Sequence, residues 1–335
     1  MMKKTLPSRW FGRIAMATLL AMACTQAGAQ TEAQADTATW AVPVISVTNL
    51  RTAGDYGMEM ETQALLGQPM RVLKNDRWML VQTPDNDKGY VLHTSLKKMT
   101  DAEMKAWNAA PQVVVTAISS WIYDKPSTRA QHVGDVVASC RLKLLGTKGR
   151  FYHVQYPDGR EGWLPTADAM PVEKWRKGVS HDAESIIATG KTLNGSPYSW
   201  GGTSTKAMDC SGFVRTVMLM HDIMLPRNAS QQAKVGQHID IAPDFSNLIP
   251  GDLVFFGRKA TDDKPAHVSH VGIYIGGKKF IHSLAWVHVS SFSPADPEYD
   301  EYDLNRLLWA QRVLPLLNKV PEVNTTDRNP YYNFK

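Results

Sequence analysis

The stretch that decides the fold is residues 196–213, which read SPYSWGGTSTKAMDCSGF. After Cys210, apolar residues recur at helical spacing along one side. This pattern predicts a buried helix that begins at Cys210, with Asp209 or Thr205 nearby as its N-terminal cap. Because a helix N-terminus carries partial positive charge, we expect a lowered pKa of the Cys210 thiol, which favours a nucleophilic thiolate. The alternative is a core cysteine that happens to start a helix.

A second motif, AHVSHVGIYIG, supplies the base that a thiol nucleophile needs. It predicts a strand on which His267 and His270 face opposite sides, so that only one can join the site. Gly272 leaves room beside His270, and we therefore choose His270. The orienting partner of the base would be His282 on the return strand. A three-residue loop centred on Gly277 would set His282 opposite Gly272, whereas an even loop would turn it to the wrong face and leave an ordinary strand histidine.

Neither a metal site nor a cofactor is expected. A strand cannot converge the rings of His267 and His270 on one ion, and no further ligand has suitable spacing. The chain has three cysteines, Cys24, Cys140 and Cys210. Two of them could form a disulfide in an exported protein. However, Cys140 alternates with two leucines on one strand face, which predicts a packed core thiol and an unpaired Cys210.

The formal net charge of +5 belongs mainly to a leader. The first 29 residues hold four basic residues and no acid, which leaves +1 for the rest of the chain. No nucleic-acid partner follows from such a balance. A basic start, an apolar run too short to span a bilayer, and Ala27-Gly28-Ala29 predict a signal peptide over residues 1–29. Lipidation at Cys24 ranks second, because Ala21, three residues before the cysteine, occupies the position at which lipoprotein signals carry Leu. Either way the protein would be exported, periplasmic or secreted, with no transmembrane segment after cleavage.

The remaining chain is long enough for several domains, and two parts of it repeat one order of signals. An aromatic strand at Trp78 or Phe151 is followed by a turn and then by GYV at Gly89 or GWL at Gly162. Each unit has roughly the size of a five-strand barrel, and an α+β pattern follows them. The expected boundaries are a signal peptide 1–29, a polar linker 30–43, a first barrel 44–99, a helical connector 100–111, a second barrel 112–172, an α+β domain 173–320 and a polar, extended tail 321–335.

Six motifs now follow one another in a recognisable order. They are PYxWGG, DCSGF, LPRxASQQ, PGDLVFF, HVGIYIG and FIHS, which begin at Pro197, Asp209, Leu225, Pro250, His270 and Phe280. They resemble the NlpC-type family of cell-wall cysteine peptidases, and both β units resemble bacterial SH3-type domains. The resemblance implies two small all-β SH3-like barrels followed by an α+β papain-like catalytic domain. It also implies Cys210 as nucleophile, His270 as general base, His282 as third polar residue and Tyr198 as a group that helps to hold the oxyanion.

The combination of domains resembles one branch of that family, the γ-D-glutamyl-L-diamino acid endopeptidases (dipeptidyl-peptidase VI-like). These enzymes cut after D-Glu in murein stem peptides whose L-Ala has a free amine, so the implied partners are peptidoglycan stem peptides or muropeptides. The resemblance implies Asp209, Ser211 and Glu59 as substrate contacts, with Glu61 as the competitor of Glu59. A carboxylate pair around an ammonium is reasonable, because burying that charge unpaired is costly. Trp200 of the first motif is also expected to contact the substrate.

The chain departs from the branch at two places. The Arg-Asp-Ser of the branch, which also touches substrate, reads Arg227-Asn228-Ala229 here. A tyrosine expected before the Gly-Trp of the first SH3-like unit is absent, since Asp87 stands two residues before Gly89. Both departures concern the free amine rather than the thiol chemistry. The rival functions are a cell-wall-binding protein with an inactive catalytic domain, and an amidase or acyltransferase on the same fold.

Overall fold

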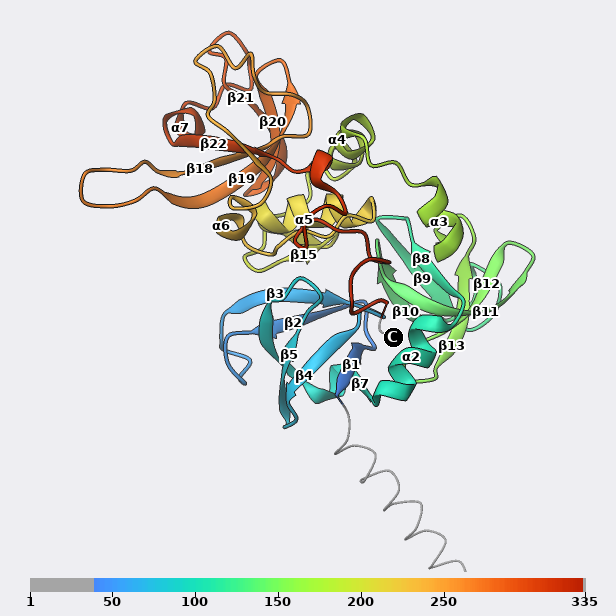
Figure 1. The fold of residues 1–335 in the computed structure, drawn as a ribbon. Coiled ribbons are helices and arrows are strands. Elements are labelled where there is room, and N and C mark those ends of the chain that lie inside the picture. The colour runs from blue at the N-terminus through green and yellow to red at the C-terminus, as the bar shows by residue number, and fades with distance from the viewer. Residues whose placement is uncertain (1–38, 334–335) are drawn as a thin grey trace, which may run out of the picture.

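The computed structural model describes residues 39–333, so the predicted signal peptide and Cys24 lie outside the described residues. The chain forms two seven-stranded sheets, then a two-stranded and a six-stranded sheet with the longer helices (Figure 1). Figure 1 shows helix α5 at the centre, where the three parts of the chain meet. From Thr39 to Asn333, no helix is both long and apolar enough to cross a membrane.

The first sheet has the strand order β3-β2-β6-β5-β4-β1-β7. Its inner face packs a small apolar core that includes Leu50, Met79 and Val81. Trp40–Pro43 form β1 of this sheet, so the expected linker ends earlier than residue 43. The strands are β1 (Trp40–Pro43), β2 (Val47–Arg51), β3 (Met60–Leu65), β4 (Met70–Lys74), β5 (Trp78–Gln82), β6 (Lys88–Leu92) and β7 (Leu96–Met99), with a 3-10 turn at His93–Ser95.

The second sheet has the order β10-β9-β13-β12-β11-β8-β14, which repeats the first sheet strand for strand. The predicted internal repeat is therefore confirmed. Each unit has seven strands rather than about five, because short strands at its beginning and end pair with each other, as β1 pairs with β7. The strands are β8 (Gln112–Val115), β9 (Ser119–Tyr123), β10 (His132–Val137), β11 (Arg141–Lys148), β12 (Phe151–Gln155), β13 (Glu161–Pro165) and β14 (Ala169–Pro171).

A helix, α2 (Asp101–Ala109), lies between the two sheets, where a helical connector was expected. Its N-terminus is a capping box, in which the Thr100 hydroxyl accepts from the Glu103 amide and the Glu103 carboxylate accepts from the Thr100 amide. Met104 and Trp107 are its buried residues. The connector is thus a packed element rather than a flexible link between the barrels.

The last domain is α+β, with helices against an antiparallel sheet of order β17-β22-β18-β19-β20-β21. Helix α5 packs Phe213 and Val214 into one core with Val271 and Ile273 of β19. The helices are α3 (Val172–Gly178), α4 (Ala183–Thr192), α5 (Cys210–Met220), α6 (Ala229–Gln232) and α7 (Glu301–Asn305), with a 3-10 turn at Leu314–Leu316. The strands are β15 (Thr203–Ser204), β16 (Ala207–Met208), β17 (Gln237–Ile239), β18 (Leu253–Arg258), β19 (His267–Gly276), β20 (Lys279–Leu284), β21 (Trp286–Ser291) and β22 (Leu307–Arg312).

The C-terminal segment after Pro321 is packed between the domains, contrary to the expected extended tail. The hydroxyl of Thr326 accepts hydrogen bonds from Arg141 at 2.8 Å and Arg176 at 3.0 Å, and donates to Asp222 at 2.6 Å. These partners belong to the second sheet, to α3 and to the end of α5. A polar sequence was compatible with this packing because polar groups such as the Thr326 hydroxyl find buried partners.

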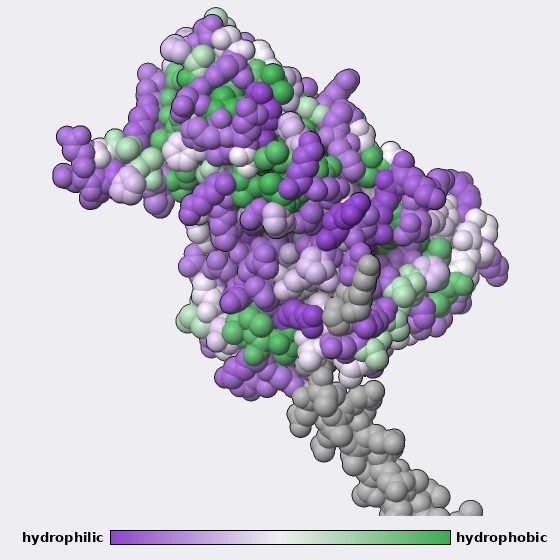
Figure 2. Space-filling model, in the orientation of Figure 1, coloured by the Kyte–Doolittle hydropathy of each residue, from purple (hydrophilic) through white to green (hydrophobic). Residues whose placement is uncertain are grey.

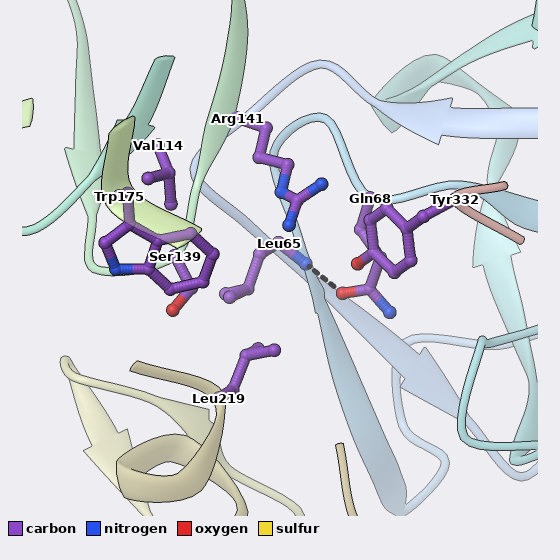
Figure 3. A pocket seen from close by; sticks show the side chains of 8 residues that line it. All are labelled: Leu65, Gln68, Val114, Ser139, Arg141, Trp175, Leu219 and Tyr332. Atoms are coloured by element: carbon purple, nitrogen blue, oxygen red, sulfur yellow. Dashed lines mark hydrogen bonds between the residues drawn. The ribbon is translucent and has the colours of Figure 1, made fainter. Parts of the chain in front are cut away.

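A small cavity of about 10 Å³ marks the point where the three domains meet. Figure 3 shows its lining, which comes from both sheets, from α3 (Trp175), from α5 (Leu219) and from the tail (Tyr332). The guanidinium of Arg141 lies 4.5 Å from the ring centre of Tyr332, a cation–π contact that ties the tail to the second sheet. In the view of Figure 1, the surface is mostly hydrophilic, with hydrophobic side chains in separate patches (Figure 2).

Candidate active site

Cys210 is the first residue of α5, as predicted, and Asp209 is the helix cap. The Asp209 carboxylate accepts from the Gly212 amide at 2.7 Å. Cys210 and Cys140 are both free thiols. Cys140 lies in the core of the second sheet, where burial raises its pKa to about 12. The expected core thiol is confirmed, and neither Cys140 nor Cys210 forms a disulfide within residues 39–333.

The expected lowering of the Cys210 pKa is wrong. Burial first, and then the neighbouring Asp209 carboxylate, raise the pKa of the thiol to about 11. The backbone amides of Ser211 and Val271 act in the opposite direction, so the helix effect is present but is outweighed. Burial likewise lowers the pKa of His270 to about 3. At neutral pH the resting pair is therefore a protonated thiol and a neutral imidazole.

Strand β19 passes beside the thiol, since the Val271 amide acts on the sulfur, and His270 is the residue that precedes Val271. Among the described residues no hydrogen bond joins Cys210 to the imidazole itself. The pairing of β18 with β19 steps from Phe256↔His270 to Gly257↔Val268, so Ser269 is the extra residue of a β-bulge. The bulge interrupts the alternation of side chains from which we predicted that His267 and His270 face opposite sides of the strand. Consequently His267 also lines the cavity in front of Cys210.

His282 is hydrogen-bonded to His270, with 2.7 Å between Nε2 of His270 and Nδ1 of His282. The predicted register is confirmed, because Gly272 lies opposite His282. The predicted three-residue loop is wrong, since only two residues separate β19 from β20 and a β-bulge at Ile275 restores the register. A Cβ on Gly272 would stand 3.2 Å from the Cβ of His282, so glycine permits this close approach. Burial, followed by the charges of His270 and His288, lowers the pKa of His282 well below its usual value. Both rings are therefore neutral at neutral pH.

The hydrogen bonds beyond His282 select one tautomer. Nε2 of His282 lies 3.1 Å from Ser290 Oγ, and that hydroxyl donates to Asp300 at 3.2 Å. Since the serine proton goes to the carboxylate, His282 donates from Nε2 and accepts at Nδ1. His270 must then donate from Nε2, which leaves its Nδ1 unprotonated. This is the protonation state that a base for the thiol requires.

A buried aspartate that the sequence did not single out also faces the two imidazoles. Asp303 Oδ2 lies 3.5 Å from His282 Nδ1 and 3.9 Å from His270 Nε2. These three side chains are of the types that bind metal ions, and their ligand atoms lie within 4.8 Å of one another. However, nitrogens bound to one zinc ion at about 2.1 Å in tetrahedral geometry stand farther apart than a hydrogen bond. The 2.7 Å contact between the rings instead indicates a shared proton.

A cavity of about 320 Å³ opens in front of Cys210. All residues predicted to contact substrate line it, together with two of the four predicted catalytic residues; His270 and His282 are buried behind it. The predicted residues in its wall are Glu59, Tyr198, Trp200, Asp209, Cys210, Ser211, Asn228 and Ala229. The wall thus combines β3 of the first SH3-like unit and the residue before it with the α+β domain.

Gly201 makes this junction between domains possible. It has φ +77°, and a Cβ on it would stand 2.3 Å from the carbonyl oxygen of Met60 in β3. Any other residue would push the first SH3-like unit away from the loop that precedes Cys210. Nearby, the Gln63 side chain accepts a hydrogen bond from the Thr203 amide at 3.0 Å and so fixes the two domains relative to each other.

The two sources of negative charge in the cavity differ in their partners. Arg227, itself buried, binds both oxygens of Asp209, at 3.1 and 2.5 Å, and donates to Thr62 of β3. Asp209 also accepts from backbone amides, so its charge is already compensated. By contrast, no ion pair involves Glu59 or Glu61 within residues 39–333. A cationic ligand in this cavity would therefore be neutralised mainly by the two glutamates.

Tyr198 lies close enough to Cys210 for the two groups to interact electrostatically. Burial, followed by the charges of Cys210 and Asp209, raises the pKa of its hydroxyl, so Tyr198 stays protonated and can donate a hydrogen bond. Asp87, at the position where the tyrosine is absent, is buried, and burial together with Asp85 raises its pKa to about 7. Trp200 is 63% exposed, which leaves its ring free to contact a ligand.

Sequence reasoning missed three participants. His267 was assigned to the wrong face because the bulge at Ser269 leaves no clear sequence signal. Arg227 was noted only as part of a divergent motif, and its ion pair with the capping Asp209 joins residues that are 18 positions apart, which leaves no local sequence signal. Asp303 lies far from the other site residues in sequence, and only the tertiary fold brings it to the histidines.

Comparisons with known families agree with this domain arrangement. Residues 195–308 match the NlpC/P60 family, and residues 50–96 match the bacterial dipeptidyl-peptidase SH3 domain. The six-motif resemblance and the predicted fold class are thereby confirmed.

Relatives of known name and structure extend over most of the chain. The γ-D-glutamyl-L-lysine dipeptidyl-peptidase of Bacillus cereus is 35% identical over 232 residues, which is 67% of either chain. The enzyme of the same name from Bacillus subtilis is 29% identical over 67% of this chain and 72% of its own. A crystal structure of an NlpC/P60 family protein from Bacillus cereus superposes with a TM-score of 0.67 at 27% identity, covering 82% of this chain and all of that one.

Proposed function

Because the chain belongs to the NlpC/P60 family of cysteine peptidases, we propose that it cleaves the γ-D-glutamyl-L-diamino acid bond of peptidoglycan stem peptides. The relatives that match over the SH3-like and peptidase parts are named for this bond, with lysine as the diamino acid. The observation that carries the proposal is the cavity in front of Cys210, where the nucleophile meets glutamates from another domain. The proposal covers either diaminopimelate or lysine as the diamino acid at the third position.

The proposed reaction uses Cys210 as nucleophile and His270 as general base. As the thiol attacks the γ-carbonyl carbon of D-Glu, its proton passes to Nδ1 of His270. The negative charge that develops on the carbonyl oxygen is stabilised by the Tyr198 hydroxyl and the Cys210 amide. The imidazolium then gives its proton to the departing amine, and water hydrolyses the thioester with His270 again as base. The thiolate forms only during attack, since the resting thiol has a pKa of about 11.

Substrate selection is proposed to depend on the free amine of L-Ala. A stem peptide that places its γ-carbonyl at Cys210 would direct the ammonium toward the cavity wall. There Glu59 and Glu61 supply negative charge that forms no ion pair with any described side chain, whereas Asp209 is paired with Arg227. Asn228, Ala229 and Ser211 complete the wall. We therefore assign the ammonium to the glutamates, with Asp209 as a structural support of the cavity.

We further propose that the protein acts outside the cytoplasm, in the periplasm or as a secreted enzyme. Peptidoglycan-derived peptides are the substrate class of the family, and the basic and apolar leader over residues 1–29 has the features of a signal peptide. The N-terminal sequence of the mature protein tests this proposal. A start near Gln30 supports signal cleavage, whereas a lipid-modified Cys24 supports the alternative.

The replacement of Cys210 by alanine tests the proposed function. We expect release of the diamino acid product from L-Ala-γ-D-Glu-diaminopimelate and from the lysine peptide to be abolished, as measured by mass spectrometry. Cys140→Ala is the matched control, because that thiol lies in the core of the second sheet and not in the cavity. Retained turnover by Cys210→Ala, or cleavage at another bond by the unmodified protein, would overturn the assignment.

A further inference from the structure

The two imidazoles face a buried ion pair that has no part in the reaction as described so far. Asp303 is completely buried in α7. Its Oδ1 lies 3.0 Å from Nε of Arg306, and its Oδ2 lies 3.5 and 3.9 Å from His282 and His270. The carboxylate thus stands between a guanidinium and two rings that are neutral at rest.

This arrangement is unfavourable for the resting protein. Arg306 compensates the charge of Asp303 from one side, but neither carboxylate oxygen makes a well-directed hydrogen bond to a described residue, and burial of such an ion pair is costly. The two imidazoles facing it carry no compensating charge in the resting state. A group held in a costly environment next to a reacting centre indicates a role in the reaction rather than in folding.

We propose that Asp303 is a positioning residue that stabilises the imidazolium formed on His270 when Cys210 loses its proton. The inference rests on the proposed thiol mechanism. Once His270 is protonated, its positive charge lies 3.9 Å from Asp303 Oδ2, in a region from which water is excluded. The charge can also be shared with His282 through the 2.7 Å hydrogen bond, and Asp303 lies still closer to that ring. Arg306 holds the carboxylate in place.

Other charged groups around the pair allow a specific pH test. Burial, followed by the charge of Asp300, raises the pKa of Asp303 to about 6, and Arg306 acts in the opposite direction. Only the ionised carboxylate can stabilise an imidazolium. Ionisation of a thiol with a pKa of about 11 makes alkylation increase steadily with pH, and ionisation of Asp303 should add an extra rise above that increase near pH 6. Within the described part of the chain, the other titratable side chain that contacts the pair is His288, whose Nε2 lies 3.1 Å from His282 Nε2, and it is the necessary control.

The experiment measures the rate of alkylation of Cys210 by iodoacetamide, a neutral reagent, between pH 4.5 and 8.5 in the full chain. Asp303→Asn is isosteric and removes only the charge. We expect alkylation about tenfold slower above pH 7, equal to roughly one pKa unit of lost imidazolium stabilisation, and only the steady increase of thiol ionisation without the extra rise near pH 6. In His288→Gln the rise through pH 6 should persist. Cys210→Ala gives the background labelling.

Arg306→Gln supplies a readout that a purely structural role would not produce. Because Arg306 lowers the pKa of Asp303, its removal should move the rise in alkylation to higher pH without abolishing it. The proposal is overturned if Asp303→Asn keeps the wild-type profile, or if His288→Gln removes the rise.

Circular dichroism and thermal melting establish that each variant is folded. If Asp303→Asn does not fold, Arg306→Gln decides the proposal, since a rise that stays at the wild-type pH in that variant also overturns it. Alkylation needs no substrate, so failure of the unmodified protein to cleave stem peptides would refute the proposed function and leave this test intact.

Discussion

The Cys210 thiol separates two regions of opposite character. In front of it lies an open cavity of about 320 Å³, whose wall comes from two domains and carries the carboxylates of Glu59 and Glu61. Behind it lies a closed set of side chains from the peptidase domain alone, in which His270, His282 and Asp303 are at most 3% exposed. The open cavity can bind ligands from solvent, whereas the buried side chains are closed to ligands and can only transfer protons.

This difference separates substrate selection from the chemical step. Charges in the cavity meet the substrate in both the ground state and the transition state, so their loss should weaken binding in both. Groups behind the thiol interact with a charge that exists only during the reaction, so their loss should lower kcat and leave KM nearly unchanged. Variants on the two sides should therefore have different kinetic signatures.

The largest effect is expected for His270→Gln. Removal of the general base should lower kcat by a factor of about 10² to 10⁴, with KM for a stem tripeptide nearly unchanged. Steady-state kinetics with L-Ala-γ-D-Glu-L-Lys measures both constants. The matched control is His267→Gln on the same strand, since His267 lines the cavity and should alter KM rather than kcat. A loss of kcat in His267→Gln with normal kinetics in His270→Gln would reverse the assignment of the two histidines.

The next largest effect belongs to the cavity. Glu59→Gln and Glu61→Gln each remove one charge without changing the shape of the side chain. If the ammonium of L-Ala binds here, loss of a charged hydrogen bond worth about 1.5–3 kcal/mol should raise KM roughly 10- to 100-fold for the residue in direct contact. The other variant should have the smaller effect, which distinguishes Glu59 from its competitor.

A substrate without the charge is the control for both glutamates. With N-acetyl-L-Ala-γ-D-Glu-L-Lys, each variant and the unmodified protein should have similar KM values, because no ammonium is left to lose. An equal penalty for the free and the acetylated peptide would show that the glutamates act on something other than the amine. The departures at Asn228 and Asp87 make this comparison informative for this chain in particular.

Much of the reactive region could be predicted from sequence because it depends on short-range patterns. Helical spacing after Cys210 located the nucleophile, and a tight turn at Gly277 set His282 opposite Gly272. The same local reasoning failed for His267, because one extra residue at Ser269 reverses the side on which the strand presents its side chains. The same reasoning mispredicted the pKa of the thiol. A position at a helix N-terminus can be read from local sequence, whereas burial depends on the whole fold.

The long-range part of the site required the fold. The contact of the first SH3-like unit with the peptidase domain depends on the approach of Gly201 to Met60, two residues that are distant in sequence. The packed tail was likewise missed, since Thr326 reads as a polar surface residue until its three partners from other elements are known. Asp303 was not predicted for the same reason, because the residues next to it in the sequence give no sign that it faces two histidines.

The smallest effect is expected for Ser290→Ala, at the far end of the hydrogen bonds behind the thiol. Ser290 fixes the tautomer of His282 by linking its Nε2 to Asp300. Loss of one such link, about 1 kcal/mol, should lower kcat about fivefold while KM stays constant. Ser290→Thr, which keeps the hydroxyl, is the matched variant and should retain more activity than alanine. A rise in KM in Ser290→Ala would mean that the two regions are coupled through β21, and the separation of binding from chemistry would then fail.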